Sequence, residues 1–175
     1  MNDWFREQMA MYTAYHRNPK NCATHFIGVP LIVFALLVAM SLFGVGQAGN
    51  IPISIATIVL TALLILYFIA VPLVGFVAMI ILVPMLWFAQ LTASGEVSTT
   101  WIIALTCFVS GWIIQFVGHV FEGRWPALFD NILQVFMAPG FLVAETLFAA
   151  GLLGELKNDL QDRSRKYGVV ATQSP

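Results

Sequence analysis

The feature that most constrains this chain is a run of 75 residues, from Asn21 to Gly95, that contains no aspartate, glutamate, lysine or arginine. A second uncharged run extends from Val97 to Phe121. A soluble helical protein needs polar positions on the exposed face of each helix, and no helix-period alternation interrupts these runs. Because about 20 apolar residues in a helix cross a bilayer, the runs predict an all-α integral membrane protein.

The boundaries of the apolar segments predict about four transmembrane helices within a single membrane domain over residues 1–175. The expected spans are residues 26–43, 51–70, 73–91 and 101–120, with an uncharged turn at residues 44–50 and a charged tail at residues 155–175. An amphipathic stripe at residues 3–17 predicts a short helix that rests on the membrane interface. Residues 128–153 are also apolar, but Pro139-Gly140 is expected to break them into a re-entrant hairpin or to interrupt a fifth hydrophobic segment.

Lysine and arginine are concentrated near the two ends of the chain. The basic residues outside the expected spans include Arg6, Arg17, Lys20, Lys157, Arg163, Arg165 and Lys166, whereas the turns at residues 44–50 and 92–100 contain none. Since basic residues stay on the cytoplasmic side of a membrane, both termini are predicted to be cytoplasmic. Four spans satisfy this orientation.

Several functional classes are disfavoured by composition and motif content. The formal net charge is −1 and no basic stripe is present, so nucleic acid is not an expected partner. The two cysteines do not form a disulfide framework. Neither a Gly-rich phosphate loop nor a Gly-x-Ser-x-Gly elbow occurs, so nucleotide-dependent and serine-nucleophile chemistry have no visible machinery.

The chain has three histidines, and the predicted topology places all of them at one face of the membrane. His25 is expected at the cytoplasmic start of the first span, His119 at the cytoplasmic end of the fourth, and His16 on the apolar stripe of the interfacial helix. The Asn18-Pro19 break between His16 and His25 allows a helix–turn–helix to bring them together. Imidazole ligands suit iron, zinc or manganese, and the sequence does not choose among them. The alternative is that His16 is a polar interfacial residue with a satisfied hydrogen bond.

Two carboxylates are candidates for catalytic work beside these histidines. Glu122 follows His119 by three residues, a spacing at which one helix can present two metal ligands; the alternative is a helix-end ion pair with Arg124. Glu145 stands among apolar residues, where an ionisable group is costly unless it has a function or a partner. It could bind the metal, orient a ligand histidine or accept a proton, or it could pair with Arg124 or Arg17. Asp130 is expected to cap the helix that follows it.

Three blocks of this sequence resemble a known family. The blocks are Tyr15-His16-Arg17-Asn18-Pro19-Lys20-Asn21-Cys22-Ala23-Thr24-His25, then Gln115-Phe116-Val117-Gly118-His119-Val120-Phe121-Glu122-Gly123-Arg124-Trp125-Pro126-Ala127-Leu128, and Ala138-Pro139-Gly140-Phe141-Leu142-Val143-Ala144-Glu145. Together they resemble the Mpo-type 2-hydroxy fatty acid dioxygenases, small polytopic membrane proteins formerly grouped as a domain of unknown function. The resemblance extends from about Met11 to Leu153, and between the blocks the spans match only in being apolar.

The resemblance implies an iron(II)-dependent enzyme that uses O2 to shorten a 2-hydroxy fatty acid by one carbon, as in α-oxidation. The histidines that the family is held to use as iron ligands correspond here to His16, His25 and His119. A long-chain 2-hydroxy fatty acid in the lipid bilayer would present its carboxylate and hydroxyl at the interface, where these histidines are expected. Arg17, Lys20 or Arg124 could pair with that carboxylate.

The membrane and the chemistry both keep alternatives at this point. The family's best-studied setting is the endoplasmic reticulum, and a bacterial cytoplasmic membrane is equally open. A zinc-dependent membrane lipid hydrolase with Glu145 as base would use the same histidines. A non-enzymatic lipid-binding protein would use them only to pack polar interfaces.

Overall fold

The computed structural model describes residues 3–49 and 51–168. The chain divides into two compact units, one made of Met1–Phe26 together with Gln115–Pro175 and the other of Ile27–Ile114. The first unit contains all three histidines, and it is therefore the unit that positions the candidate site. The expectation of a single membrane domain over residues 1–175 stays a prediction.

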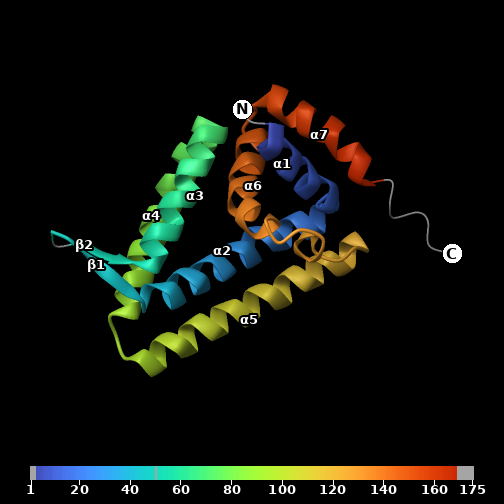
Figure 1. The fold of residues 1–175 in the computed structure, drawn as a ribbon. Coiled ribbons are helices and arrows are strands. Elements are labelled where there is room, and N and C mark those ends of the chain that lie inside the picture. The colour runs from blue at the N-terminus through green and yellow to red at the C-terminus, as the bar shows by residue number, and fades with distance from the viewer. Residues whose placement is uncertain (1–2, 50, 169–175) are drawn as a thin grey trace. The chain divides into compact units, whose positions relative to one another are not determined.

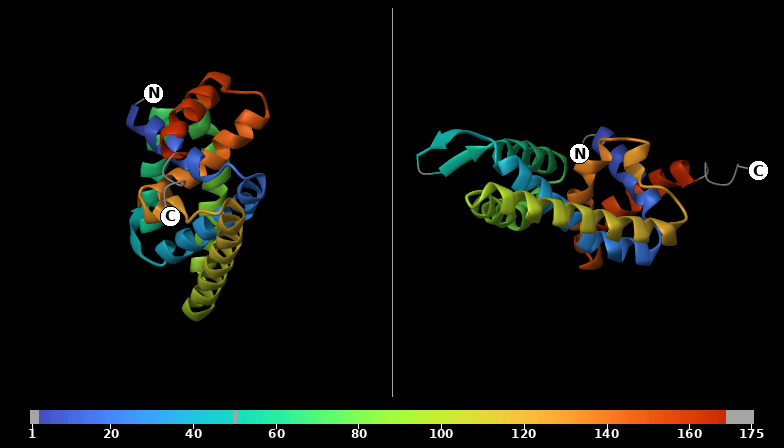
Figure 2. Two further views of the ribbon diagram at one scale, coloured as in Figure 1. Left: turned by 90° about the vertical axis from the view of Figure 1, so that its right-hand side faces the viewer. Right: turned by 90° about the horizontal axis from the view of Figure 1, so that it is seen from below.

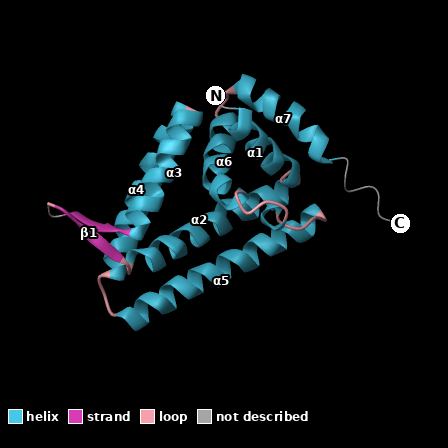
Figure 3. Ribbon diagram, viewed as in Figure 1, coloured by secondary structure: helices cyan, strands magenta, loops and turns pink. Residues whose placement is uncertain are grey.

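The described residues are predominantly helical (Figure 1, Figure 3). The α-helices are α1 (Asp3–Tyr15), α2 (Pro19–Ser41), α3 (Ile55–Ala70), α4 (Pro72–Ala93), α5 (Val97–Glu122), α6 (Gln134–Ala149) and α7 (Gly154–Gly168), with a 3-10 turn η1 (Ala127–Phe129) and a hairpin of β1 (Gly44–Ala48) and β2 (Ile51–Ser54). Among the described residues, α2, α4 and α5 are long and apolar enough to cross a membrane, whereas α3 and α6 are shorter. The helical, apolar architecture of a membrane protein is thus confirmed, and the count of four spans stays a prediction.

The predicted turn at residues 44–50 is wrong in form, because β1 and β2 pair as an antiparallel hairpin there. Helix α3, which corresponds to the span predicted at residues 51–70, therefore starts at Ile55, four residues later than predicted. Ser54 determines this start: its Oγ accepts from the Thr57 N–H, and Thr57 Oγ1 accepts from the Ser54 N–H in return. Such a capping box satisfies backbone donors that the first helical turn leaves unpaired.

In the second unit, the reversal between α3 and α4 occurs where the sequence predicts it. Val71 ends α3 by donating its N–H to the Tyr67 carbonyl, and Pro72 begins α4. Proline suits a first helical position because the N–H it lacks would have had no partner there. The two helices then approach closely, since a Cβ added at Gly75 would lie 2.6 Å from the Phe68 backbone nitrogen.

The break expected at Asn18-Pro19 begins two residues earlier, at residues 16–18, and α2 begins at Pro19, seven residues before the predicted first span. Asn18 acts as the cap, because its Oδ1 accepts from the Lys20 N–H at 2.9 Å. Pro19 then takes the first helical position. As a result His25 lies inside α2, in its second turn, while His16 lies in the short turn before it.

The break expected at Pro139-Gly140 does not occur, since α6 continues through both residues. Pro139 lies in the second turn of this helix, where its missing N–H removes only one backbone hydrogen bond. The irregular part of the 128–153 segment lies earlier, between η1 and the start of α6 at Gln134. Asp130 does not cap α6; its carboxylate accepts from the Tyr15 hydroxyl, and Asn131 Oδ1 accepts from the Leu133 N–H instead.

The predicted charged tail is helical over residues 154–168, and the remaining residues of that prediction lie outside the described part. Helix α7 lies beside α1 rather than free at the surface (Figure 1, Figure 2). The Arg163 guanidinium contacts carboxylate oxygens of Glu7 and Asp159, each at 2.9 Å. Glu7 also forms an ion pair with Lys166 and accepts from the Tyr167 hydroxyl at 2.8 Å. Charges that the sequence suggests for a solvated face therefore join the two helices.

Candidate metal centre

The three histidines come from three different elements of the first unit and meet in its interior. His16 lies in the turn after α1, His25 in the second turn of α2, and His119 in the last turn of α5. All three side chains are buried, His25 to the point of 1% exposure. One ring nitrogen from each lies within 4.8 Å of the others, which is a spacing that one metal ion can bridge. The structure thus brings the sequence-predicted histidines together.

Each ring is oriented by a backbone carbonyl on its Nδ1 side. Nδ1 of His16 lies 2.7 Å from the Tyr12 carbonyl, that of His25 2.9 Å from the Asn21 carbonyl, and that of His119 3.1 Å from the Arg124 carbonyl. A carbonyl oxygen only accepts, so each Nδ1 must carry the proton. The Nε2 atom of each neutral ring then keeps a free lone pair, as in histidines that bind metals.

The lone pairs are brought close to one another. His16 Nε2 and His25 Nε2 lie 2.9 Å apart, a contact that is repulsive unless a cation or a proton lies between them. Burial lowers the pKa of His16 well below its usual value, and the neighbouring His25 and His119 lower it further, so protonation is opposed. The donor set therefore fits a metal ion with imidazole preference better than it fits an empty packed core.

Two aromatic residues, which the sequence analysis does not single out as site residues, form a wall of the site. The Tyr12 ring stacks on His16 with centroids 4.0 Å apart and planes 8° from parallel. Phe141 of α6 contacts Tyr12, with centroids 4.5 Å apart. Tyr12 precedes His16 by four residues on the same helical stripe, which is the sequence signal that could have indicated it. Together these rings exclude water from the imidazoles and restrict the rotation of His16.

The structure places Glu122 outside the group of converging ring nitrogens. Its carboxylate accepts from the Arg17 N–H at 3.0 Å, the Asn18 N–H at 2.9 Å and the Asn21 side-chain amide at 3.0 Å. Within the described residues it forms no ion pair with Arg124, the alternative that the spacing suggests. Glu122 therefore holds the turn between α1 and α2.

Glu145 also lies outside that group, half-buried on α6. Because all three Nδ1 atoms already face backbone carbonyls, Glu145 does not orient a histidine. No hydrogen bond or ion pair to its carboxylate is found in the described part of the chain, so neither Arg124 nor Arg17 is its partner. Its carboxylate is left available for another role.

The three basic candidates differ clearly in their surroundings. The Arg124 guanidinium stacks 3.5 Å from the centre of the Tyr15 ring, and its Nη1 donates to the Tyr167 carbonyl at 3.2 Å. The Arg17 guanidinium donates to the Ser164 carbonyl at 3.3 Å. Lys20 is exposed, with its Nζ 5.0 Å from the centre of the Phe121 ring. Only Arg124 of these three also borders the cavity described next.

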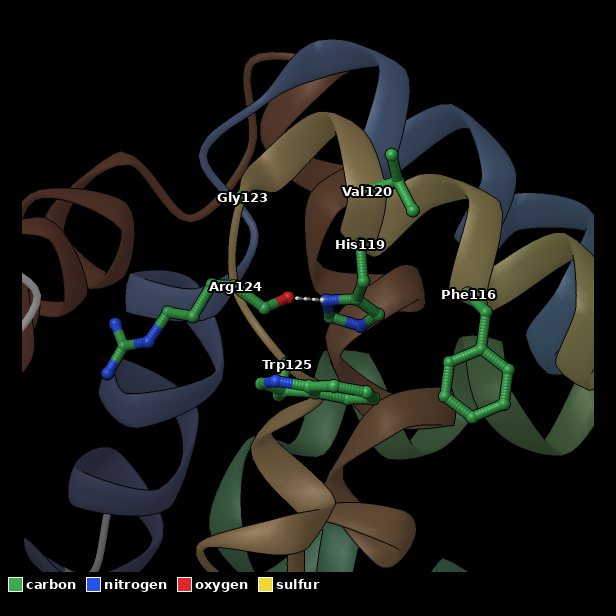
Figure 4. Close-up of a pocket in the computed structure, with 6 residues that line it drawn as sticks. All are labelled: Phe116, His119, Val120, Gly123, Arg124 and Trp125. Carbon is green, nitrogen blue, oxygen red and sulfur yellow. Dashed lines mark hydrogen bonds between the residues drawn. The ribbon is translucent and has the colours of Figure 1, made fainter.

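A cavity of about 500 Å³ opens beside His119 (Figure 4). Its lining is mostly apolar and comes from one stretch of chain: Phe116, His119, Val120, Gly123, Arg124 and Trp125. In Figure 4 the Trp125 ring lies beside the His119 imidazole, the Arg124 carbonyl faces that imidazole, and the Arg124 side chain extends away from it. An apolar space that reaches a polar cluster at one end suits an amphipathic ligand.

The fold and the site together define a helical membrane protein with a buried three-histidine centre that could hold a metal ion beside an apolar cavity. Residues 3–150 match the family model described as 2-hydroxy-palmitic acid dioxygenase Mpo1-like, and the chain belongs to this family. It is 36% identical over 158 residues to the protein named 2-hydroxy-palmitic acid dioxygenase MPO1 of Saccharomyces cerevisiae, a match that covers 89% of this chain and 87% of the relative. No solved structure matches the chain.

Proposed function

We propose that this chain is an iron(II)-dependent dioxygenase that shortens a long-chain 2-hydroxy fatty acid by one carbon. Membership of the family and the name of the yeast relative support the reaction and the substrate class. The observation that carries the proposal is the convergence of one ring nitrogen from each of the three histidines beside an apolar cavity. The reaction balances with one O2: a 2-hydroxy acid and O2 give the acid one carbon shorter, carbon dioxide and water.

His16, His25 and His119 would hold the metal. Three protein ligands leave coordination positions free, as in other non-haem iron oxygenases, and bound iron(II) would supply the redox chemistry with O2 that these side chains lack. The carbonyls of Tyr12, Asn21 and Arg124 keep the rings in the metal-binding tautomer. Tyr12 and Phe141 keep bulk water away from the histidines.

The substrate would enter from the bilayer with its acyl chain in the cavity along Phe116, Val120 and Trp125. Arg124 is the best candidate for its carboxylate, because it borders the same cavity as His119. Among the described residues its Nη1 donates to the Tyr167 carbonyl, and a guanidinium offers five donors in all. Arg17 and Lys20 are the weaker candidates, since neither borders the cavity.

Glu145 would act as a proton acceptor for the substrate hydroxyl. Metal binding and orientation of a histidine, the two other roles open to it, do not fit its position outside the cluster. A half-buried carboxylate that has no hydrogen bond or ion pair in the described residues is suited to proton transfer. We expect Glu145→Gln to keep the metal and lose turnover.

The topology completes the proposal. Both termini would lie on the cytoplasmic side, with four crossings and the histidines at that face, in the endoplasmic reticulum or a bacterial cytoplasmic membrane. Membrane-impermeant thiol labelling of Lys157→Cys, in a chain whose own cysteines are replaced by alanine, tests the orientation of α7. Labelling from outside intact cells or sealed vesicles with the native orientation would contradict it.

The decisive experiment uses the full chain, purified anaerobically in detergent. Elemental analysis should find about one iron per chain, and O2 uptake should occur with 2-hydroxypalmitate but not with palmitate, which lacks the hydroxyl. His25→Ala should lose both. Zinc with turnover that does not need O2 would favour the lipid hydrolase, and absence of metal with tolerance of all three histidine substitutions would favour the lipid-binding protein.

A further inference from the structure

The carboxylate of Glu122 connects the end of α5 to the turn between α1 and α2. Oε1 accepts from the Arg17 N–H, and Oε2 accepts from the Asn18 N–H and from the Asn21 side chain. We propose that Glu122 is a positioning residue that sets the spacing of the three histidines. The proposal rests on the proposed function in one respect, that these histidines bind a metal.

Glu122 acts on His16 through the turn in which that histidine lies. This turn, residues 16–18, lies between the two helices, and a single backbone bond ties it back to α1, from the His16 N–H to the Thr13 carbonyl at 3.3 Å. The N–H groups of Arg17 and Asn18 are the next two donors along the chain, and donors at the start of a helix lack intrahelical partners. Glu122 accepts from both at 3.0 and 2.9 Å. Because Glu122 is three residues from His119, one side chain ties the turn of His16 to the helix of His119.

Glu122 reaches His25 through Asn21. The Asn21 amide is fully buried at 0% exposure and donates both to Glu122 at 3.0 Å and to the Tyr15 carbonyl at 3.2 Å. The backbone carbonyl of the same residue accepts from Nδ1 of His25. A movement of Asn21 would therefore turn the His25 ring, and Glu122 opposes that movement.

Helices α2 and α5 approach each other closely at Gly118. A Cβ added to Gly118 would lie 2.6 Å from Oδ1 of Asn21, so only glycine permits this contact next to His119. With the helices so close, the Glu122 carboxylate has little freedom to bind elsewhere. The steric contact and the hydrogen bonds thus act at the same place and fix the same spacing.

The chemistry requires a carboxylate. Two oxygens accept three hydrogen bonds from two sides, and an ionised acceptor makes them stronger than neutral ones. The isosteric Glu122→Gln variant keeps one oxygen but directs an NH2 group at a backbone donor. Glutamine should therefore fill the space and weaken the clamp, which separates positioning from packing.

The test is a Co²⁺ titration of the full-length chain in detergent after chelator treatment, followed by visible absorption. Outer partners of metal ligands change metal affinity by about 10–100-fold, and we expect a loss of about that size in Glu122→Gln together with a changed cobalt spectrum. Glu122→Asp has a side chain one methylene shorter, and its Co²⁺ affinity should be reduced by at least as much. The matched control is Glu96→Gln at the other end of α5, where the carboxylate accepts from Ser98 and Thr99 and should not affect cobalt.

The outcomes are distinct from those of the oxygenase assay. If Glu122→Gln bound Co²⁺ with the affinity and spectrum of the unaltered chain, the positioning role would be overturned. A fall in thermal stability alone would not rescue it. If Glu122→Gln weakened Co²⁺ binding as expected but the unaltered chain did not oxidise 2-hydroxypalmitate, the positioning role would stand and the proposed reaction would be rejected. Absence of Co²⁺ binding by the unaltered chain would overturn the metal site and this inference with it.

Discussion

The Nε2 atoms of His16 and His25 lie 2.9 Å apart, and each ring has its Nδ1 against a backbone carbonyl. The carbonyls fix the tautomer of both rings, with the proton on Nδ1. Without a metal, the two Nε2 lone pairs therefore face each other in the protein interior. A cation held by both histidines would relieve this repulsive contact. This geometry therefore suits a metal ion better than it suits an empty site.

Metal removal should therefore lower the thermal stability of the chain. A ligand at 100 times its dissociation constant adds about 2.7 kcal/mol to the free energy of unfolding, and chelation should remove a contribution of this order. His16→Ala should show no metal-dependent shift, because one ligand is lost and the lone-pair contact is relieved. Thermal unfolding in detergent with and without Fe²⁺ measures both effects. An equal metal-dependent shift in His16→Ala would contradict the site.

Arg124→Ala should raise the KM for a 2-hydroxy fatty acid. Hydrogen bonds to charged groups contribute about 1.5–3 kcal/mol, which corresponds to a rise of roughly tenfold or more. The backbone carbonyl that orients His119 remains in this variant, so the metal content should stay unchanged. Lys20→Ala is the control, because Lys20 does not border the cavity. A larger effect in the control than in Arg124→Ala would assign the carboxylate to Lys20.

Trp125→Ala should affect long acyl chains more than short ones. Trp125 borders the cavity yet is 74% exposed, so its removal should change the stability of the fold little. The lost apolar contact corresponds to about 25 cal/mol per Å² of buried area, and its effect grows with the length of chain that it covers. Ratios of kcat/KM for 2-hydroxy acids of increasing length provide the measurement. A uniform decrease at every length would indicate a role for Trp125 at the metal instead.

Glu7 should make the α1–α7 contact sensitive to acid. Its hydrogen bond with Lys166, helped by Tyr167 and Arg163 and opposed by burial, lowers the pKa of Glu7 from 4.5 to about 2. Because its pKa is lower in the folded state, ionised Glu7 stabilises the fold fully above pH 4.5. This stabilisation is lost as the pH falls to about 2. Glu7→Gln should thus unfold more easily near neutral pH, with a difference that disappears towards pH 2. Unfolding curves across this range test it, with Glu155→Gln, which has no ion pair in the described residues, as control.

Most of the helices can be predicted from the sequence, because charge and hydropathy are properties of local segments. The spans expected at residues 73–91 and 101–120 correspond to α4 and α5, and the Pro72 reversal is where the pattern indicates it. The boundaries that were wrong depend on capping by single side chains. Asn18 starts α2 earlier and Ser54 starts α3 later than hydropathy alone predicts. A single capping side chain can shift the first residue of a helix by a few positions, and hydropathy averaged over a segment does not show that shift.

The sequence by itself determined that the chain is a helical membrane protein, that its three histidines are the candidate ligands, and that it resembles the 2-hydroxy fatty acid dioxygenases. Those properties follow from composition, charge placement and motifs, which are read along the chain. Only the tertiary structure decided that Arg124 borders the cavity, that Glu145 has no hydrogen bond or ion pair in the described residues, and that Glu122 binds a turn instead of joining the candidate metal ligands. Glu122 and Arg17 are 105 residues apart. Whether such groups meet depends on how α2 and α5 pack, and spacing within one helix does not contain that information.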